Sequence, residues 1–252
     1  MQGINSINQC ISEEEKKKRT GVLLINAFGW FIFAIFVVVS YGLVLGVYAV
    51  IWVINFLLSE YNVRKLLSVG TAASPKQFPE IYNATVEICE QLGIKRVPRV
   101  IILNESSINA FAVKFAREKV IVLLSQTLEG VIDKPQELRF FLGHELAHVV
   151  LDHGWRGSFE MYKPASYKAA REMTCDNVGA AVAGDLNSAV NALKRTAIGN
   201  HLIDRIDDEH LEDEASYIYS GFTGWLLKQY MSYPPLGKRI NGVKQFVQEP
   251  NF

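Results

Sequence analysis

The stretch "GHELAHVVLDHG", residues 143–154, places two histidines four positions apart and a glutamate directly after the first. Residues four apart on an α-helix project from the same face, so His144 and His148 can bind one metal ion. Glu145 lies about 100° round the helix, where it can reach a metal-bound water without ligating the metal. The pattern predicts a metal-dependent hydrolase. The alternative is a core helix whose polar side chains are satisfied elsewhere, although burying them without partners is costly.

The chain around this motif has the features of a single helix over 131–154. Asp133 can cap its start, Pro135 suits its first turn, and Glu137 favours the positive end of the helix dipole. Gly154 is a residue type that commonly ends a helix. We therefore expect the two histidines to lie on a regular helix.

A catalytic zinc ion needs a third protein ligand and an open position. Glu172 is the candidate, because it follows His148 by 24 residues and the chain can turn and return as a second helix. Asp176 lies four residues further on, on the same face, and can hold the outer nitrogen of a ligating histidine. Small residues that permit close helix packing continue nearby: Gly179, Ala180, Ala183 and Gly184. The alternative is that Glu172 and Asp176 lie on an ordinary solvent-exposed face of a helix. This alternative explains their charges but not the small residues that follow them.

A long uncharged apolar stretch, residues 21–59, lies near the start of the chain. As one helix it would be about 57 Å long, whereas the hydrocarbon core of a bilayer is only about 30 Å thick. Two membrane helices with a tight turn near 40–42 resolve this mismatch. The basic flanks, 16–19 and 64–65, then lie on one side, which the positive-inside rule makes cytoplasmic. A re-entrant hairpin that does not fully cross the bilayer is the alternative.

The rest of the chain is expected to form one α+β domain over 60–252, with a cytoplasmic segment, 1–20, ahead of the hairpin. Three elements are predicted before the histidine helix: a helix from Ser74 or Pro79 to Gly93, and strands over 98–104 and 118–125. The chain beyond the histidine helix reads as mostly helical to about residue 228.

Charge and cysteine content narrow the class of protein. The net charge is zero, which gives no argument for nucleic-acid binding. The three cysteines, Cys10, Cys89 and Cys175, are few, odd in number and far apart, so they do not predict a disulfide framework. A reducing compartment is the simpler reading. Cys175 stands three residues after Glu172 and therefore falls near the predicted metal.

The motifs "HELAH", "REMTCD" and "NAFA" together resemble those of the HtpX-like zinc metallopeptidases, the group that includes the type-I CAAX prenyl proteases. The resemblance runs from about Pro79 to Ile240. It implies a mainly helical catalytic domain of the gluzincin type with a small β-sheet. It also implies zinc ligands at His144, His148 and Glu172, with Glu145 as general base and Asp176 as the aspartate that follows the ligand glutamate.

The resemblance also implies a substrate site. Asn109, Ala110, Phe111 and Ala112 match the segment that pairs with the substrate backbone beside the zinc. In "MSYPPLGKRI" the family usually has histidine before the proline, whereas this chain has Tyr233, followed by Arg239 as a substrate-binding residue. Tyrosine can still donate a hydrogen bond to a developing oxyanion, so we count Tyr233 among the catalytic residues.

One further departure concerns the membrane. HtpX and the prenyl proteases carry membrane helices between the histidine helix and the ligand glutamate. The residues that separate His148 from Glu172 here are too few and too polar to span a bilayer. The chain therefore resembles a compact member with one N-terminal membrane anchor.

These features predict a membrane-anchored zinc metalloendopeptidase that hydrolyses unfolded or membrane-associated proteins, with Glu145 acting on a zinc-bound water. The expected cofactor is one Zn²⁺ per chain. The expected partners are polypeptide substrates and the lipid bilayer, with no nucleic acid. The expected location is the bacterial inner membrane, with the catalytic domain on the cytoplasmic side. The alternative is a proteolytically inactive, membrane-anchored zinc-binding scaffold or holdase, against which the intact Glu145 argues.

Overall fold

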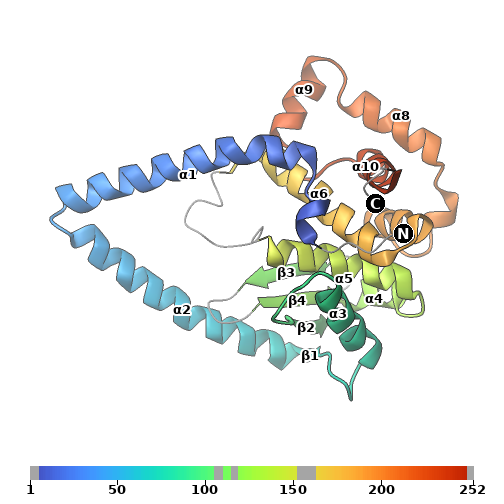
Figure 1. The fold of residues 1–252 in the computed structure, drawn as a ribbon, viewed down its shortest axis with the longest axis horizontal. Coiled ribbons are helices and arrows are strands. Elements are labelled where there is room, and N and C mark those ends of the chain that lie inside the picture. Colours follow the sequence, from blue (N-terminus) through green and yellow to red (C-terminus); the bar gives the residue numbers. More distant parts are fainter. Residues whose placement is uncertain (1–5, 105–109, 115–118, 152–162, 249–252) are drawn as a thin grey trace.

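The computed structural model of the chain describes residues 6–104, 110–114, 119–151 and 163–248, and at 110–114 and 208–209 it describes the backbone alone. The described chain is mainly helical with one small sheet, which confirms the predicted α+β class (Figure 1). The α-helices are α1 (Glu13–Val39), α2 (Leu43–Val69), α3 (Pro79–Gln91), α4 (Ser125–Val131), α5 (Pro135–Val150), α6 (Ala165–Ala183), α7 (Leu186–Ile198), α8 (Asp208–Ile218), α9 (Gly221–Tyr230) and α10 (Leu236–Gln248). Two short 3-10 turns are η1 (Ile7–Cys10) and η3 (Ile203–Arg205).

The sheet has four strands in the order β1-β2-β4-β3: β1 (Gly70–Ala72), β2 (Arg99–Leu103), β3 (Ala110–Lys114) and β4 (Lys119–Leu124). The predicted strands over 98–104 and 118–125 are β2 and β4, which pair in parallel. The outer strands, β1 and β3, are antiparallel to their neighbours. Their pairing was not predicted, because β1 is only three residues long and its sequence, "GTA", carries no periodic pattern.

Both faces of the sheet are covered, as the continuous apolar runs of β2 and β4 require. One face joins the main core, in which buried residues of α3, α5 and α6 pack together. The other face forms a smaller cluster, against which Leu66 and Leu67 of α2 pack. The last turns of α2 therefore belong to the globular body, and the expected boundary between residues 59 and 60 falls inside this helix.

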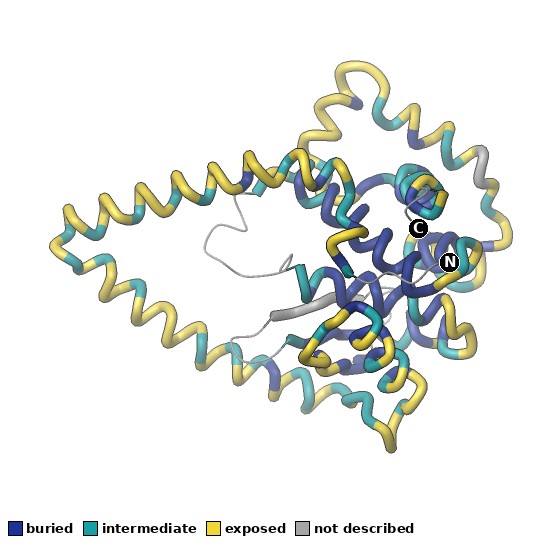
Figure 2. The backbone as a smooth tube through the Cα atoms, viewed as in Figure 1, coloured by how far each residue is buried: buried dark blue, intermediate teal, exposed yellow. Residues whose placement is uncertain are grey.

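The first two helices extend away from the body and meet at a tip formed by Ser40, Tyr41 and Gly42 (Figure 1). Tyr41 and Gly42 both have positive φ angles, 49° and 85°, which reverse the chain in very few residues. Both helices are 27 residues long and apolar enough to cross a membrane. Figure 2 shows that their surfaces are largely exposed along the projecting part, so the described part of the protein does not cover them.

The N-terminal segment, which we expected only to precede the hairpin, docks on α6. Cys10 is fully buried, and its carbonyl oxygen accepts a hydrogen bond from Asn177. Ser12 caps α1 and donates its hydroxyl hydrogen to the carbonyl oxygen of Ala170. The hydroxyl of Thr174 donates to the carboxylate of Glu15 at 2.6 Å. The start of the membrane hairpin is thereby fixed to the helix that carries Glu172.

The histidine helix, α5, begins at Pro135, but Lys134 rather than Asp133 stands at its N-cap and makes no side-chain cap hydrogen bond. The prediction of an Asp133 cap is therefore wrong by one position. Pro135 already fixes the first helical φ angle and has no N–H to satisfy, which reduces the need for a side-chain cap. Gly154, the predicted end of the helix, lies outside the described residues.

Helices α5 and α6 approach each other at two glycines. A Cβ atom placed on Gly143 would lie 3.2 Å from the Cα of Gly179 and 2.3 Å from a methyl group of Val182. A Cβ atom on Gly179 would lie 2.8 Å from the carbonyl oxygen of Phe140. The small residues that we singled out on α6 therefore allow the two helices to pack almost backbone to backbone.

Gly179→Ala should destabilise the protein, because the added methyl group meets the backbone of α5 and cannot be relieved by a side-chain rotation. We expect a loss of about 1–3 kcal/mol, as for other overpacked sites, measured as a lower unfolding temperature in detergent. Gly46→Ala is the matched control, because nothing lies within 4 Å of a Cβ atom there. Equal unfolding temperatures for wild type and Gly179→Ala would contradict the close approach of α5 and α6.

Candidate metal centre

The side chains of His144, His148 and Glu172 meet between α5 and α6. The Nε2 atoms of the two histidines are 3.2 Å apart. One carboxylate oxygen of Glu172 lies 3.5 Å from Nε2 of His144, and the other lies 3.5 Å from Nε2 of His148. The chain therefore turns after α5 and returns as α6, as the sequence spacing predicts. This return brings all three side chains together.

These separations fit a tetrahedral metal site. Zinc bonds to nitrogen and oxygen are about 2.0–2.2 Å long, so neighbouring ligand atoms on a tetrahedron lie roughly 3.3–3.6 Å apart. Two imidazoles and one carboxylate are also a donor set that zinc accepts in catalytic sites, where a fourth position stays open. The residues present are therefore compatible with one zinc ion.

Cys175 is a competing candidate, because its sulfur and the ring nitrogens of His144 and His148 all lie within 4.8 Å of one another. A cysteine binds metal as the thiolate. Burial, and then the negative charges of Glu172 and Asp176, raise the pKa of the Cys175 thiol well above its ordinary value. Glu172 behaves in the opposite way. Burial alone would raise its pKa, but the two imidazoles hold it well below the usual range. Glu172 is the better third donor.

Asp176 holds the outer face of the His144 ring. Its Oδ1 atom lies 2.9 Å from Nδ1 of His144, which leaves Nε2 pointing toward His148 and Glu172. Burial alone would lower the pKa of His144, but its hydrogen bonds to Asp176 and Glu172 outweigh burial and raise the pKa to about 10. A carboxylate on the outer nitrogen both orients an imidazole and increases its basicity as a ligand.

Asp176 is itself held by Arg239 of α10. The guanidinium makes a two-pronged contact, from Nε to Oδ2 at 2.7 Å and from a terminal nitrogen to Oδ1 at 2.6 Å. Burial alone would raise the pKa of Asp176, but the charge of Arg239 brings it below its ordinary value. Both side chains are almost fully buried. No local sequence pattern indicates this pair, because the two residues are 63 positions apart.

Glu145 lies in the same pocket of the core. Its residue is 96% removed from solvent, and among the described residues nothing hydrogen-bonds its Oε2 atom. Burial raises the pKa of its carboxyl group, against the opposing charges of His144 and His148. Buried carboxylate oxygens normally have partners, so an orphan beside this donor set points to a ligand that completes it.

Tyr233 contacts Arg239, which in turn contacts Asp176. The guanidinium of Arg239 donates a hydrogen bond to the Tyr233 hydroxyl and lies 4.4 Å from the centroid of its ring. The hydroxyl accepts this bond, so its own hydrogen remains able to donate. Arg239 is buried on Asp176 rather than spread on an open surface, and its predicted contact with substrate stays a prediction.

The predicted substrate segment lies on β3, at one edge of the sheet. Asn109 lies outside the described residues, whereas the backbone of Ala110, Phe111 and Ala112 pairs with β4. Among the described strands, none pairs with the other edge of β3. This strand packs beside α5, so an edge that no other described strand pairs with belongs to a strand next to the histidine helix.

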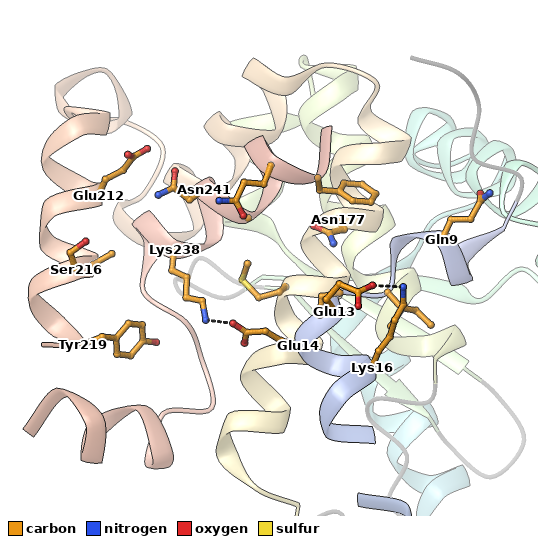
Figure 3. Close-up of a pocket in the computed structure, with 17 residues that line it drawn as sticks. Gln9, Glu13, Glu14, Lys16, Asn177, Glu212, Ser216, Tyr219, Lys238 and Asn241 are labelled. Carbon is orange, nitrogen blue, oxygen red and sulfur yellow. Dashed lines mark hydrogen bonds and ion pairs between the residues drawn. The ribbon is translucent and has the colours of Figure 1, made fainter. Parts of the chain in front are cut away.

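A separate cavity of about 540 Å³ lies over another face of α6, between the N-terminal segment, α8 and α10 (Figure 3). Met173 and Asn177 of α6 line it, whereas none of the described residues around the metal centre does. Lys238 and Glu14 form an ion pair at 2.8 Å across it. The cavity is therefore distinct from the metal centre.

Comparisons with known proteins find relatives for the part of the chain that carries the histidine helix. The family model of peptidase family M48 matches residues 75–163, which include both histidines and Glu145. A protease HtpX homolog of Streptococcus agalactiae is 29% identical over 142 residues, which cover 52% of this chain and 47% of that protein. A protease HtpX homolog of Thermococcus kodakarensis is 30% identical over 97 residues, 38% of this chain and 33% of that protein.

A plastoglobule-localized metallopeptidase 48 of Arabidopsis thaliana is 25% identical over 194 residues, which cover 66% of this chain and 56% of that protein. No solved structure matches significantly. The chain spans between about a third and just over half of the length of these curated relatives. The M48 match over residues 75–163, the HtpX relatives and the helical α+β fold together show that this part of the chain is similar to the HtpX-like peptidases of family M48.

Proposed function

We propose that this protein is a membrane-anchored, zinc-dependent endopeptidase that hydrolyses peptide bonds of unfolded or membrane-associated polypeptides. The observation that carries the proposal is the buried carboxylate of Glu145 beside the converging side chains of His144, His148 and Glu172. A zinc site that serves only structure has no need for an extra buried carboxylate that ligates nothing. A scaffold or holdase with a structural metal leaves Glu145 unexplained.

In the proposed reaction His144, His148 and Glu172 hold one zinc ion, and Asp176 fixes the ring of His144. Bound zinc would supply Lewis-acid polarisation of the scissile carbonyl and of the attacking water. Glu145 accepts the proton of that water and passes it to the leaving amine. Burial raises the pKa of the Glu145 carboxyl group, which makes its carboxylate a stronger base than an exposed one.

Tyr233 is proposed to donate its free hydroxyl hydrogen to the developing oxyanion, while Arg239 holds the phenol oxygen in place. The edge of β3 supports the proposed mode of substrate binding. A peptide added as a further strand along Ala110–Ala112 would be held by its backbone, which makes recognition broad in sequence. Such breadth suits the degradation of unfolded chains.

The hairpin supports the proposed membrane location. Both basic flanks, 16–19 and 64–65, lie at the end of the hairpin that joins the body, opposite the tip at Ser40–Gly42 (Figure 1). The positive-inside rule then places the catalytic domain in the cytoplasm, which in a bacterial cell means the inner face of the inner membrane. The relatives from bacteria and archaea carry the name protease HtpX homolog, whereas the plant relative is named as chloroplastic.

The zinc content of variants should show whether Glu172 or Cys175 is the third metal ligand. The purified wild type should hold about one zinc per chain, Glu172→Ala should lose most of it, and Cys175→Ala should keep it. Asp176→Ala should weaken binding by roughly 10–100-fold, since it removes the partner that orients His144. Metal analysis after dialysis against a weak chelator measures all four proteins. Zinc retained by Glu172→Ala but lost from Cys175→Ala would assign the third ligand to the cysteine.

Glu145→Gln should abolish most of the proteolysis while zinc stays bound. The amide keeps the shape of the side chain but cannot accept a proton, so the rate should fall by at least about 10²–10⁴-fold. Cleavage of unfolded casein by wild type and variant, with zinc content measured on the same samples, checks this. Equal cleavage by the two proteins would remove Glu145 from the mechanism. A wild type that binds zinc and prevents aggregation of unfolded chains without cutting them would favour the holdase.

Arg239→Met should destabilise the protein strongly, because it leaves the Asp176 carboxylate buried without its counter-charge. Removal of one partner of a buried ion pair costs about 3–5 kcal/mol. Arg239→Lys should recover only part of this, since an ammonium group cannot reproduce the two-pronged contact. Lys238→Met is the matched control on the same helix: its partner Glu14 is partly exposed, so the loss should stay within about 1 kcal/mol. Denaturant unfolding of the detergent-solubilised proteins compares the three variants, and a loss for Arg239→Met no larger than the control's would contradict the buried pair.

A further inference from the structure

Helix α9 has an apolar arc that faces away from the protein. Phe222, Trp225, Leu226 and Tyr230 follow the i, i+3, i+4, i+8 spacing that places side chains on one side of a helix. The opposite side carries Gly224, whose missing side chain lets the helix pack on the backbone of residues 218–219. The sequence pattern predicts only that this region belongs to the mostly helical part of the chain that follows the histidine helix.

None of the residues that the structure describes covers this arc. Gly224 is the one buried residue of α9. Phe222 is 74% exposed, Trp225 56% and Tyr230 76%, and the rings of Phe222 and Trp225 stack with their centroids 5.8 Å apart. Scattered exposed apolar residues are ordinary, but a contiguous aromatic and aliphatic face on one short helix marks an interaction surface.

The position of α9 indicates what covers this face. Helices α1 and α9 both pack on α6, and α9 lies beside the base of α1 (Figure 1). Lys228 of α9 is close enough for its charge to act on Glu14 and Lys18 of α1. Lys18 belongs to the basic flank that immediately precedes the uncharged stretch. The apolar arc of α9 is therefore at the level where α1 passes from the body into its membrane-spanning part.

Basic residues gather at the same level. Lys228 and Lys238 lie 5.6 Å and 5.9 Å from the ring centroid of Tyr219. Tyr219 and Lys238 line the cavity in Figure 3. Together with the flank 16–19 the two lysines place positive charge next to the aromatic face. Helices that lie in the headgroup layer of a bilayer combine these two features: Trp, Phe and Leu on the buried side and lysines toward anionic headgroups.

We propose that α9 is an interfacial membrane helix, seated in the headgroup layer of the bilayer that holds α1 and α2. Its arc of Phe222, Trp225, Leu226 and Tyr230 would contact the outer part of the acyl chains. Tyr and Trp suit this depth, because their rings are apolar and their polar groups reach water. The inference rests on the proposed insertion of the hairpin. It adds a second point of contact, which would fix the tilt of the catalytic domain against the membrane surface.

The test measures how deeply α9 lies in the bilayer and does not depend on enzymatic activity. Single cysteines are introduced in the full-length chain at Phe222 and Leu226, at Ile35 of α1 as a hairpin reference, and at Asn83 of α3 as a reference in water. The native cysteines are buried, so a nitroxide label attaches at the introduced position. The proteins are reconstituted one chain per nanodisc, in phosphatidylcholine with a quarter of phosphatidylglycerol. Accessibility of the label to oxygen, which enters lipid, is compared with accessibility to a polar nickel complex.

We expect oxygen to relax the labels at 222, 226 and 35 more than the nickel complex does, and the reverse at 83. Trp225→Glu should shift the label at 226 toward the aqueous value without changing the unfolding temperature, since Trp225 is exposed. Nickel-accessible labels at 222 and 226, with the label at 35 in lipid, would overturn the inference and leave the hairpin intact. In larger discs, which can hold more than one chain, two labels at 222 on neighbouring copies would broaden each other's spectra. If this broadening appeared and the nickel complex were excluded from the label only in those larger discs, the apolar arc of α9 would be an interface with a second copy. That result would also overturn the inference. A nickel-accessible label at 35 would refute the hairpin insertion and this inference together, whereas the peptidase proposal would still be judged by Glu145→Gln.

Discussion

The close approach of α5 and α6 at Gly143 and Gly179 is the constraint on which the rest of the site depends. Any larger side chain at these two positions would meet backbone or a neighbouring methyl group. With both glycines in place, the histidine face of α5 and the Glu172 face of α6 come within 3.5 Å of each other. Interiors are close-packed and deform little, so a gap of even one methyl group between these helices would separate the ligands.

A chain of buried polar contacts then fixes the orientation of His144, one of the predicted ligands. It runs from His144 to Asp176, from Asp176 to Arg239, and from Arg239 to Tyr233. Each group has a partner, which is the condition under which a buried polar network adds rigidity rather than a desolvation penalty. These contacts run through Arg239 of α10 and end at Tyr233, which lies between α9 and α10. The C-terminal helix therefore belongs to the metal centre, although it contributes no predicted ligand.

The parts of this structure that follow from local pattern were predictable from the sequence. Histidines four apart, an uncharged run of 39 residues and the apolar runs of β2 and β4 each encode an element through spacing alone. Contacts between distant residues have no such signature. The Arg239–Asp176 pair, the docking of Cys10 on Asn177 and the brevity of β1 are decided by tertiary packing, which short-range periodicity does not report. The arc on α9 had a readable spacing, but its meaning depends on its place beside α1.

Helix α6 joins the metal centre to the membrane anchor. Ser12 and Glu15, at the start of α1, bind α6 at Ala170 and Thr174, and these positions flank Glu172 by two residues on either side. Two residues correspond to a rise of only about 3 Å, and a helix with its side chains is about 10 Å across. The start of the membrane helix and the metal cluster are thus held on opposite faces of one turn of α6. In the proposed membrane-bound peptidase, a polypeptide segment that emerges from the bilayer would therefore meet the metal centre close to the membrane surface.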